Sequence, residues 1–360
     1  MVFKLEVSEN VRGFDDPEEE KRRFAEDVED GLLEEQKHLP SERFYDDEGS
    51  ILFQRIMELP EYYPTKCEAG ILLKQKENLR SLLSHGDKGF NLIDLGAGDA
   101  QKTKVLLRHL RDKETDFTYM PVDISEGSMV ELMGKLKHEF DDSLDVYGVA
   151  GEYEKALHWL IHNQPGECMN RPNLVLFLGG NIGNFQPRDA RRFLRRLQMR
   201  LNNGDYLFTG FDLKKNRDVL EKAYNDSKGV TKEFNLNLLT RINRELGADF
   251  NIAGFSHHSY FNEERDAMES YLVNSSGIEQ VVNIPYINMK FKIAPDESIR
   301  TEYSYKFEVG RKPPVSSRKQ GGIEWLATTT GYEQIQLMFD SKSRFCDGLF
   351  RVLKSGNLES

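Results

Sequence analysis

Residues 91–103 read NLIDLGAGDAQKT, and this stretch decides the fold. A short apolar run closes at Asp94, Gly96 and Gly98 permit a tight turn, and a helix is expected to begin near Asp99. Glycines in such a turn let the backbone approach a ligand, and the N-terminus of a helix offers N–H donors. The stretch therefore predicts a strand, a turn and a helix with a ligand at the turn.

Strand and helix patterns alternate outward from this turn. Apolar strand candidates cover residues 91–95, 117–122, 146–149, 173–178 and 206–211, and helix candidates include residues 101–110, 154–162 and 188–200. This alternation predicts a parallel sheet with helices on both faces. Residues 331–340 and 346–354 read as two strands joined by a short polar turn, which predicts an antiparallel hairpin at the sheet edge. Such a sheet is the layout of the common methyltransferase fold.

Two regions depart from the alternating pattern. The acidic start of the chain, up to about Glu35, reads as helical or partly disordered. Residues from about 214 to 307 mix long helices with polar and aromatic strands, more than one crossover connection requires. We expect this second region to be an insertion.

Composition and charge narrow the class of protein. The 360 residues are 38% hydrophobic and 30% charged, no apolar run is long enough to span a bilayer, and no signal peptide is recognisable, so we expect a cytoplasmic protein. The net charge of −11 argues against nucleic acid as a partner. The basic residues 188–200 read as one helix with a solvated face. Three distant cysteines and no CxxC pair indicate neither a metal site nor a disulfide framework.

The first motif separates two classes of adenosine cofactor. Asp94 at the strand end suits a ligand with an ammonium and a sulfonium, whereas a carboxylate beside a pyrophosphate would repel it. Gln101 stands where the dinucleotide pattern has its third glycine. The motif therefore favours S-adenosyl-L-methionine (SAM) over a nicotinamide cofactor, which remains the alternative.

Two further motifs fit an adenosine but do not identify the cofactor. Asp123 ends the next strand, where a carboxylate can accept both ribose hydroxyls, and it could equally cap a helix. Glu152 and Tyr153 follow a strand where an adenine would lie, and could accept its amino group and pack on its ring. A polar start to the next helix explains that pair as well.

Two polar segments are candidates for a substrate site. Residues 174–185, LVLFLGGNIGNF, put glycines and asparagines after a buried strand, and an asparagine amide can accept from an amine while donating to a carboxylate. Residues 300–307, RTEYSYKF, alternate so that Glu302 and Ser304 share one strand face with Lys306. That face is either solvated or the floor of a polar pocket.

Taken in order, these strings resemble the histidine-specific methyltransferase family. The resemblance rests on FYDDEGSILFQRIMELPEYYPTKCE, LGAGDAQKT, YMPVDIS, FLGGNIGN, AYNDSKGVTKEFNLNLLTRINRELGADF and TEYSYKF, and it runs from about Phe24 to the C-terminus. The founding members of that family trimethylate the α-amine of L-histidine on the way to ergothioneine. The resemblance implies an α/β fold, with a Rossmann-like SAM methyltransferase core and a second α+β domain that binds substrate.

The resemblance also implies segment boundaries and site residues. Residues 1–66 and 214–306 would form the substrate domain, and residues 67–213 and 307–360 the core. The cofactor would be held by Asp94, Gly96, Gly98, Lys102, Asp123, Glu152 and Tyr153. Substrate contacts would come from Phe53, from Asn184 and Tyr224 on the amino and carboxylate groups, and from Tyr62, Glu302 and Ser304 on the imidazole. Tyr45 would lie near the amine, so Tyr45 and Asn184 are the catalytic candidates.

Alternatives to L-histidine methylation remain open at this point. Ser270 stands where relatives often carry a methionine against the ring, which permits an aromatic or indole amine, whereas Glu302 opposes one. A non-catalytic SAM-binding regulator is a third reading of the chain. For the leading interpretation we expect a monomer with a small amino-acid substrate, no metal, and no nucleic-acid or membrane partner.

Overall fold

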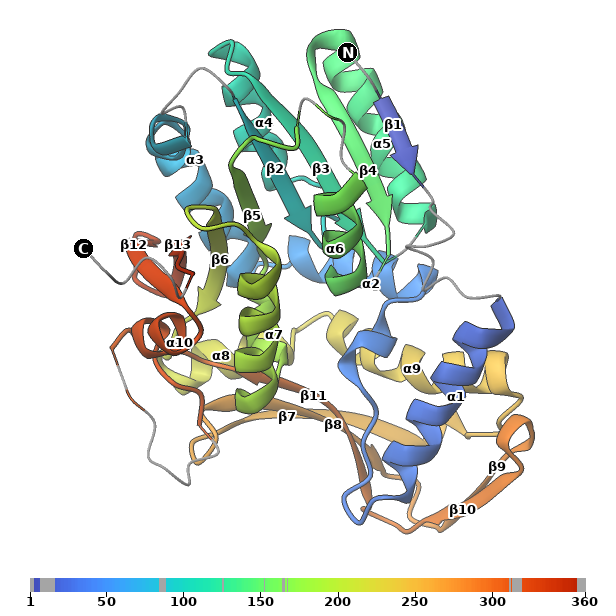
Figure 1. Cartoon of the computed structure of the whole chain (residues 1–360). Coiled ribbons are helices and arrows are strands. Elements are labelled where there is room, and N and C mark those ends of the chain that lie inside the picture. The colour runs from blue at the N-terminus through green and yellow to red at the C-terminus, as the bar shows by residue number, and fades with distance from the viewer. Residues whose placement is uncertain are drawn as a thin grey trace.

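The computed structural model describes residues 3–6, 17–83, 89–124, 126–151, 153–163, 166, 168–310, 312 and 319–354. Its centre is an eight-stranded sheet in the order β1-β4-β3-β2-β5-β6-β13-β12 (Figure 1). The strands are β1 (Phe3–Glu6), β2 (Phe90–Leu95), β3 (Phe117–Asp123), β4 (Asp145–Ala150), β5 (Asn173–Phe177), β6 (Tyr206–Asp212), β12 (Tyr332–Phe339) and β13 (Phe345–Val352).

The sheet is parallel from β1 to β6 and antiparallel at the far edge. Neighbours β2 and β5 run parallel, whereas β13 is antiparallel to both β6 and β12. The predicted parallel sheet and its C-terminal hairpin are confirmed. The additional edge strand β1, parallel to β4, was not predicted from the acidic start of the chain.

Helices cover both faces of this sheet. On one face lie α3 (Tyr63–Leu83), α4 (Thr103–Asp112) and α5 (Glu126–Phe140), packed on side chains such as Leu92 and Leu174. On the other lie α6 (Tyr153–Asn163), α7 (Pro187–Arg200) and α10 (Ile323–Thr329), packed on Ile93 and Val175. Successive strand residues thus point to opposite cores, which explains the continuous apolar runs of the central strands.

Helix α7 illustrates how the pattern produces the packing. Proline at the first helical position suits the helix start, and Phe193, Leu194 and Leu197 form its buried stripe. Arg192, Arg195 and Arg196 are exposed. The basic segment is therefore an amphipathic helix with a solvated arginine face, as its spacing predicted.

A second assembly lies against the carboxyl ends of the parallel strands (Figure 1). Its strands form one sheet in the order β11-β8-β7 and a separate hairpin of β9 and β10. The bounds are β7 (Phe255–Asn262), β8 (Ala267–Asn274), β9 (Gln280–Ile284), β10 (Met289–Ile293) and β11 (Ser298–Tyr305), with helices α1 (Pro17–Leu33), α2 (Asp47–Glu58), α8 (Arg217–Tyr224) and α9 (Val230–Leu246). Short 3₁₀ turns include η1 (Ser41–Phe44) and η3 (Asn181–Asn184).

This assembly has a hydrophobic core of its own. Residues from α1, η1 and α2 pack with residues from α9 and from strands β7 to β11 in one cluster. The N-terminal segment and the insertion therefore share a core despite their separation in sequence. The expected boundary between residues 66 and 67 falls inside α3, whose side chains from Tyr63 onward belong to a core of the large sheet. None of the helices within the described ranges combines the length and apolar character of a membrane span.

Candidate active site

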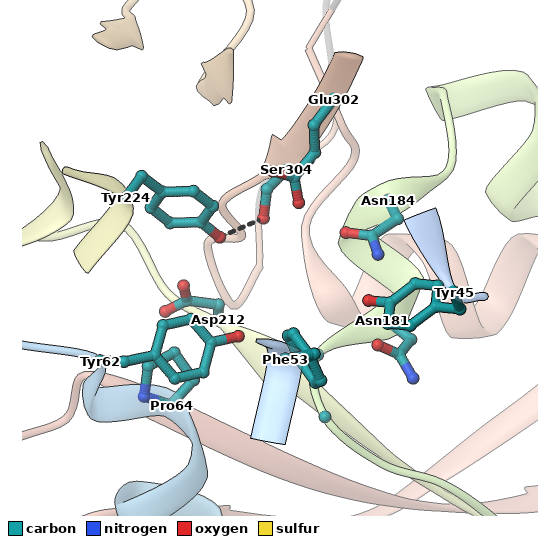
Figure 2. A pocket seen from close by; sticks show the side chains of 12 residues that line it. Tyr45, Phe53, Tyr62, Pro64, Asn181, Asn184, Asp212, Tyr224, Glu302 and Ser304 are labelled. Carbon is teal, nitrogen blue, oxygen red and sulfur yellow. Dashed lines mark hydrogen bonds between the residues drawn. The ribbon is translucent and has the colours of Figure 1, made fainter. Parts of the chain in front are cut away.

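A cavity lies between the large sheet and the second assembly (Figure 2). It is lined by Tyr45, Phe53, Tyr62, Pro64, Gly179, Gly180, Asn181, Asn184, Asp212, Tyr224, Glu302 and Ser304, around about 370 Å³ of space that includes the part open to solvent. Every residue expected to contact the substrate lines this one cavity. They come from α2, η3, α8 and β11, and from the residues directly after η1 (Tyr45) and directly before α3 (Tyr62), so the fold brings them together from across the chain.

Aromatic rings form one wall. Phe53 on α2 packs edge to face against Tyr45, with ring centroids 5.5 Å apart, and against Tyr62 at 6.1 Å. Phe234 of α9 supports this wall from behind, 5.8 Å from Tyr45 and 5.9 Å from Phe53. The wall suits a flat, partly apolar ligand.

The opposite side is polar and belongs to β11. Glu302 and Ser304 point into the cavity from the same strand face (Figure 2). Burial raises the pKa of Glu302, whereas the positive charge of Lys306 and a hydrogen bond from Ser270 lower it. The predicted sharing of one face by the two residues is confirmed, and that face is a pocket wall rather than a solvated surface.

Lys306 organises this polar side although its own ammonium is fully buried. It donates to the Tyr224 hydroxyl at 2.9 Å and to Ser304 Oγ at 2.8 Å, and it pairs with Asp212 at 2.9 Å. The Tyr224 hydroxyl donates to Ser304 Oγ at 2.7 Å. Ser304 therefore accepts two hydrogen bonds from the protein.

Asp212 is a cavity residue that the sequence analysis missed. It ends β6, and it accepts from the Tyr63 hydroxyl at 2.8 Å and pairs with Lys215 and Lys306. Burial opposes its charge, but the two lysines hold the pKa of its carboxyl below the usual range. The signal that could have revealed it is the one used for Asp94 and Asp123, an aspartate at the carboxyl end of a parallel strand.

Several cavity groups have no hydrogen-bond partner among the described residues. The hydroxyls of Tyr45 and Tyr62 and the amide of Asn184 line the cavity, and no side-chain hydrogen bond joins them to another described residue. Burial, reinforced by the charge of Glu302, raises the pKa of Tyr45, so its phenol stays protonated at neutral pH. All three residues are half-buried, so their polar groups are available to a polar ligand in the cavity.

The glycine turn after β2 has the geometry of a ligand cradle. Gly96 and Gly98 have φ of +77° and +53°, a region that favours glycine. A side chain on Gly96 would press on the Tyr153 hydroxyl at 2.7 Å, whereas one on Gly98 would meet nothing within 4 Å. The Gly98 N–H donates to Asp123 Oδ2 at 2.9 Å. Gly98 thus borders open space, with Asp123 beside it, which fits an adenosine cofactor.

Lys102 is tied to the loop after β5 through Glu68 of α3. Glu68 is fully buried, pairs with Lys102, and accepts from the Gly179 N–H at 2.7 and 2.9 Å. Gly179 and Gly180 line the cavity. One carboxylate therefore links Lys102, which follows the glycine turn, to the loop that lines the cavity.

Asp94 lies at the end of β2 but is engaged by the protein. Its Oδ2 accepts from Thr103 Oγ1 at 2.7 Å and from the Tyr119 hydroxyl at 2.8 Å. Burial raises the pKa of Asp94 to about 6 despite these hydrogen bonds. This geometry fastens β2 to β3 and to the start of α4, and direct cofactor contact by Asp94 stays a prediction. Glu152 lies outside the described residues.

No cluster of three or more metal-ligating side chains occurs among the residues that the structure describes. The described polar side chains that line the cavity are hydroxyls, two amides and two carboxylates, and the buried ammonium of Lys306 lies behind them. These can bind and orient an amino acid by hydrogen bonds and charge.

Comparisons with known proteins agree with this chemistry. The model of a family described as histidine-specific, SAM-dependent methyltransferases matches residues 24–352. Histidine N-alpha-methyltransferase of Mycolicibacterium smegmatis is 35% identical over 281 residues, 78% of this chain and 83% of that protein. Ergothioneine biosynthesis protein 1 of Schizosaccharomyces pombe is 30% identical over 74% of this chain and 34% of its own length. L-tryptophan methyltransferase trpM of Psilocybe serbica is 30% identical over 67% of this chain and 72% of its own.

Proposed function

The chain belongs to the family of histidine-specific, SAM-dependent methyltransferases, and from that premise we propose that it methylates the α-amine of L-histidine. The proposal extends to three successive methylations, which would give the trimethyl betaine used in ergothioneine biosynthesis. Family membership sets aside the nicotinamide interpretation, since the cofactor of the family is SAM.

The observation that supports histidine most strongly is that the Ser304 hydroxyl must act as a hydrogen-bond donor toward the cavity. A hydroxyl oxygen has two lone pairs and one proton, and Ser304 Oγ already accepts from Lys306 and Tyr224. Its own proton is therefore left to donate into the cavity. Glu302, when ionised, can only accept. Together they match a neutral imidazole, which has one N–H to donate and one nitrogen lone pair to accept.

An indole ring fits this pair less well. Indole has one N–H and no ring lone pair, so it could satisfy Glu302 but would leave the Ser304 hydroxyl unpaired. A site that hydrogen-bonds its substrate rejects an analogue lacking the partner group by roughly four orders of magnitude. The polar groups of β11 therefore support histidine over tryptophan.

At the amine end, Asn184 and Tyr45 are the proposed contacts. The Asn184 amide can accept from the amine and donate to the carboxylate. Because the raised pKa keeps the Tyr45 phenol protonated, it can accept a hydrogen bond from the amine and take part in a hydrogen-bonded proton path without being an obligatory base. Tyr224, proposed as a further contact, keeps one lone pair for an amine N–H while its proton is held by Ser304.

On the cofactor side, we assign binding to Gly96, Gly98, Lys102, Asp123 and Tyr153, with Glu152 as a further expected contact. SAM, when bound, supplies an electrophilic methyl group. The residues of the chain hold the amine in line with that group, and such alignment is a main source of rate enhancement in two-substrate reactions.

The proposal includes a monomer that works in the cytoplasm without a nucleic-acid or membrane partner. The net charge of −11 supports the exclusion of nucleic acid, since binding it depends on neutralising phosphates.

Replacement of Glu302 tests the substrate assignment. We expect Glu302→Ala to lose histidine turnover while S-adenosylhomocysteine still binds, because Glu302 lies on β11 and away from the glycine turn. Glu279→Ala, on a half-exposed residue outside the cavity, serves as the control and should leave turnover intact. Unchanged histidine turnover in Glu302→Ala would contradict an imidazole contact at this residue. If the wild-type chain methylated no amine at all, the result would favour the alternative that it is a non-catalytic SAM-binding regulator.

A further inference from the structure

The three-stranded sheet places a row of polar residues behind the ring pocket. In the register of the strands, Ser259 on β7 lies opposite Ser270 on β8, and Ser270 lies opposite Glu302 on β11. Residues directly opposite on neighbouring strands face the same side of a sheet. His257, two residues before Ser259 on β7, shares that side. The row thus leads from the cavity wall to the edge strand.

Hydrogen bonds connect every member of this row. Ser270 Oγ donates to Glu302 Oε2 at 3.3 Å, Ser259 Oγ lies 2.8 Å from Ser270 Oγ, and His257 Nε2 lies 2.9 Å from Ser259 Oγ. Ser270 is fully buried between its two neighbours. A buried serine here has no solvent to replace either partner.

The chain of bonds has a definite direction when Glu302 is ionised. Ser270 has one proton and gives it to the carboxylate, so it must accept from Ser259. Ser259 then has no proton left for the histidine, so His257 must donate through Nε2–H. Such aligned hydrogen bonds polarise one another and strengthen the final donor.

We propose that Ser270, supported by Ser259 and His257, is a positioning residue that holds Glu302 as an ionised acceptor for the ring N–H of the substrate. The proposal rests on the proposed function, because the ring N–H is that of histidine. Ser270 thereby helps to determine specificity without touching the substrate.

The charges around both ends of the row are consistent with this direction. Lys306, directly after β11, stabilises the carboxylate, and the phenols of Tyr45, Tyr62 and Tyr224 and the carboxyl of Asp212 are further titratable groups of the same cavity or beside it.

At the other end, burial lowers the pKa of His257 to about 4, so its ring is neutral at pH 7. His258 and Lys232 lower that pKa further, whereas Asp226 raises it. A neutral ring with its proton on Nε2 is the donor that the row requires.

The test is the pH dependence of L-histidine binding, measured by calorimetry with S-adenosylhomocysteine present. Removing the Ser270 donor raises the pKa of Glu302, so ionisation needs a higher pH. We expect Ser270→Ala to bind histidine about tenfold more weakly at neutral pH, as for a lost hydrogen bond to a charged group. The midpoint of its binding curve should move to higher pH relative to wild type. Ser259→Ala should shift the curve in the same direction by less.

Ser256→Ala is the matched control, since Ser256 is on β7 but has the opposite side-chain direction and lies opposite Val273. Its pH profile should equal that of the wild type. An unchanged profile in Ser270→Ala, with histidine still bound by the wild type, would overturn the positioning role alone.

A second measurement tests the row even if histidine is not the substrate. The ¹⁵N shifts of His257 in the full chain should report a neutral ring protonated on Nε2. A lone pair on Nε2 would reverse the direction of the row and overturn the proposal. Wild-type chain that binds no histidine at any pH would instead refute the proposed function.

Discussion

Ser304 is the residue on which the proposed ring recognition depends, because two protein groups occupy both lone pairs of its hydroxyl oxygen. Lys306 and Tyr224 both donate to its oxygen. Their joint effect is to aim the hydroxyl proton at the cavity. A fully buried lysine thus acts on the substrate through its neighbour, without lining the cavity itself.

Ser304→Ala should therefore change selectivity more than cofactor binding. Loss of the donor should weaken histidine binding by about 1–2 kcal/mol, whereas an indole, which cannot use that donor, should lose little. The ratio of L-histidine to L-tryptophan affinity, measured with S-adenosylhomocysteine bound, should fall. Ser298→Ala, on the same strand and away from the cavity, should leave the ratio unchanged. A constant ratio in Ser304→Ala would exclude Ser304 as a ring contact.

At the scale of single residues, the sequence predicts which side chains share one face of a strand, because side chains alternate between the two faces. Alternation placed Glu302 and Ser304 on one face, because that relation depends only on neighbours along the chain. Asp212 meets Tyr63, 149 residues earlier in the sequence, and that contact depends on the packed fold. The role of Lys306 depends on Asp212 in the same way.

Helix α3 is the element that couples the two halves of the site. Its Glu68 pairs with Lys102, after the glycine turn proposed for the cofactor, and accepts from the Gly179 N–H at the cavity proposed for the substrate. A second carboxyl, Asp347 on β13, is fully buried nearby, and no described residue gives its oxygens a hydrogen bond. Burial and the charge of Glu68 hold the pKa of Asp347 well above its usual range, whereas the charge of Lys102 lowers it.

The two carboxyls should respond differently to amide replacement. Glu68→Gln removes the charge that holds Lys102, so S-adenosylhomocysteine should bind about tenfold more weakly, as expected for a lost charged hydrogen bond. Asp347→Asn alters a carboxyl that receives no hydrogen bond from a described residue, so the affinity should stay unchanged. Calorimetry on both variants makes the comparison. If both variants lost the same S-adenosylhomocysteine affinity, or if neither lost any, the charge of Glu68 would not position Lys102.

The glycine turn after β2 allows a second test of an element. Gly98 and Gly204 both have positive φ, +53° and +91°, and a side chain on either meets nothing within 4 Å. Alanine at either position should cost about 1 kcal/mol of folding stability through backbone strain. Gly98→Ala alone should also weaken S-adenosylhomocysteine binding, because its methyl group would occupy the proposed ligand space. Equal affinities in the two variants would place the cofactor elsewhere.

The sequence predicted those strands and helices in which apolar residues form a continuous run or recur at helical spacing. It did not predict an element that lacks such a pattern. The buried strands β2, β3, β5 and β6 and the amphipathic helix α7 follow their patterns closely. Strand β1 was missed because its short sequence sits in an acidic segment and depends on pairing with the distant strand β4. Pairing between distant segments has no local signature.

For the whole molecule, the cavity exists only where two hydrophobic assemblies meet. Asn184 and Asp212 come from the large sheet and its loops, and Tyr45 and Glu302 from the second assembly. The break in pattern after Asp212 indicated an insertion, whereas only the family resemblance implied that the N-terminal segment joins that insertion in one domain. That partnership rests on contacts between residues such as Phe44 and Phe234, stacked 4.4 Å apart.

The central claim is that this shared cavity recognises a neutral imidazole attached to an α-amino acid. The most direct test is calorimetric titration of the chain, saturated with S-adenosylhomocysteine, with L-histidine, its Nα-dimethyl form and L-tryptophan. We predict that both histidine forms bind and that tryptophan binds far more weakly. Tryptophan binding as tightly as histidine, or no binding of histidine while S-adenosylhomocysteine is still held, would contradict the claim.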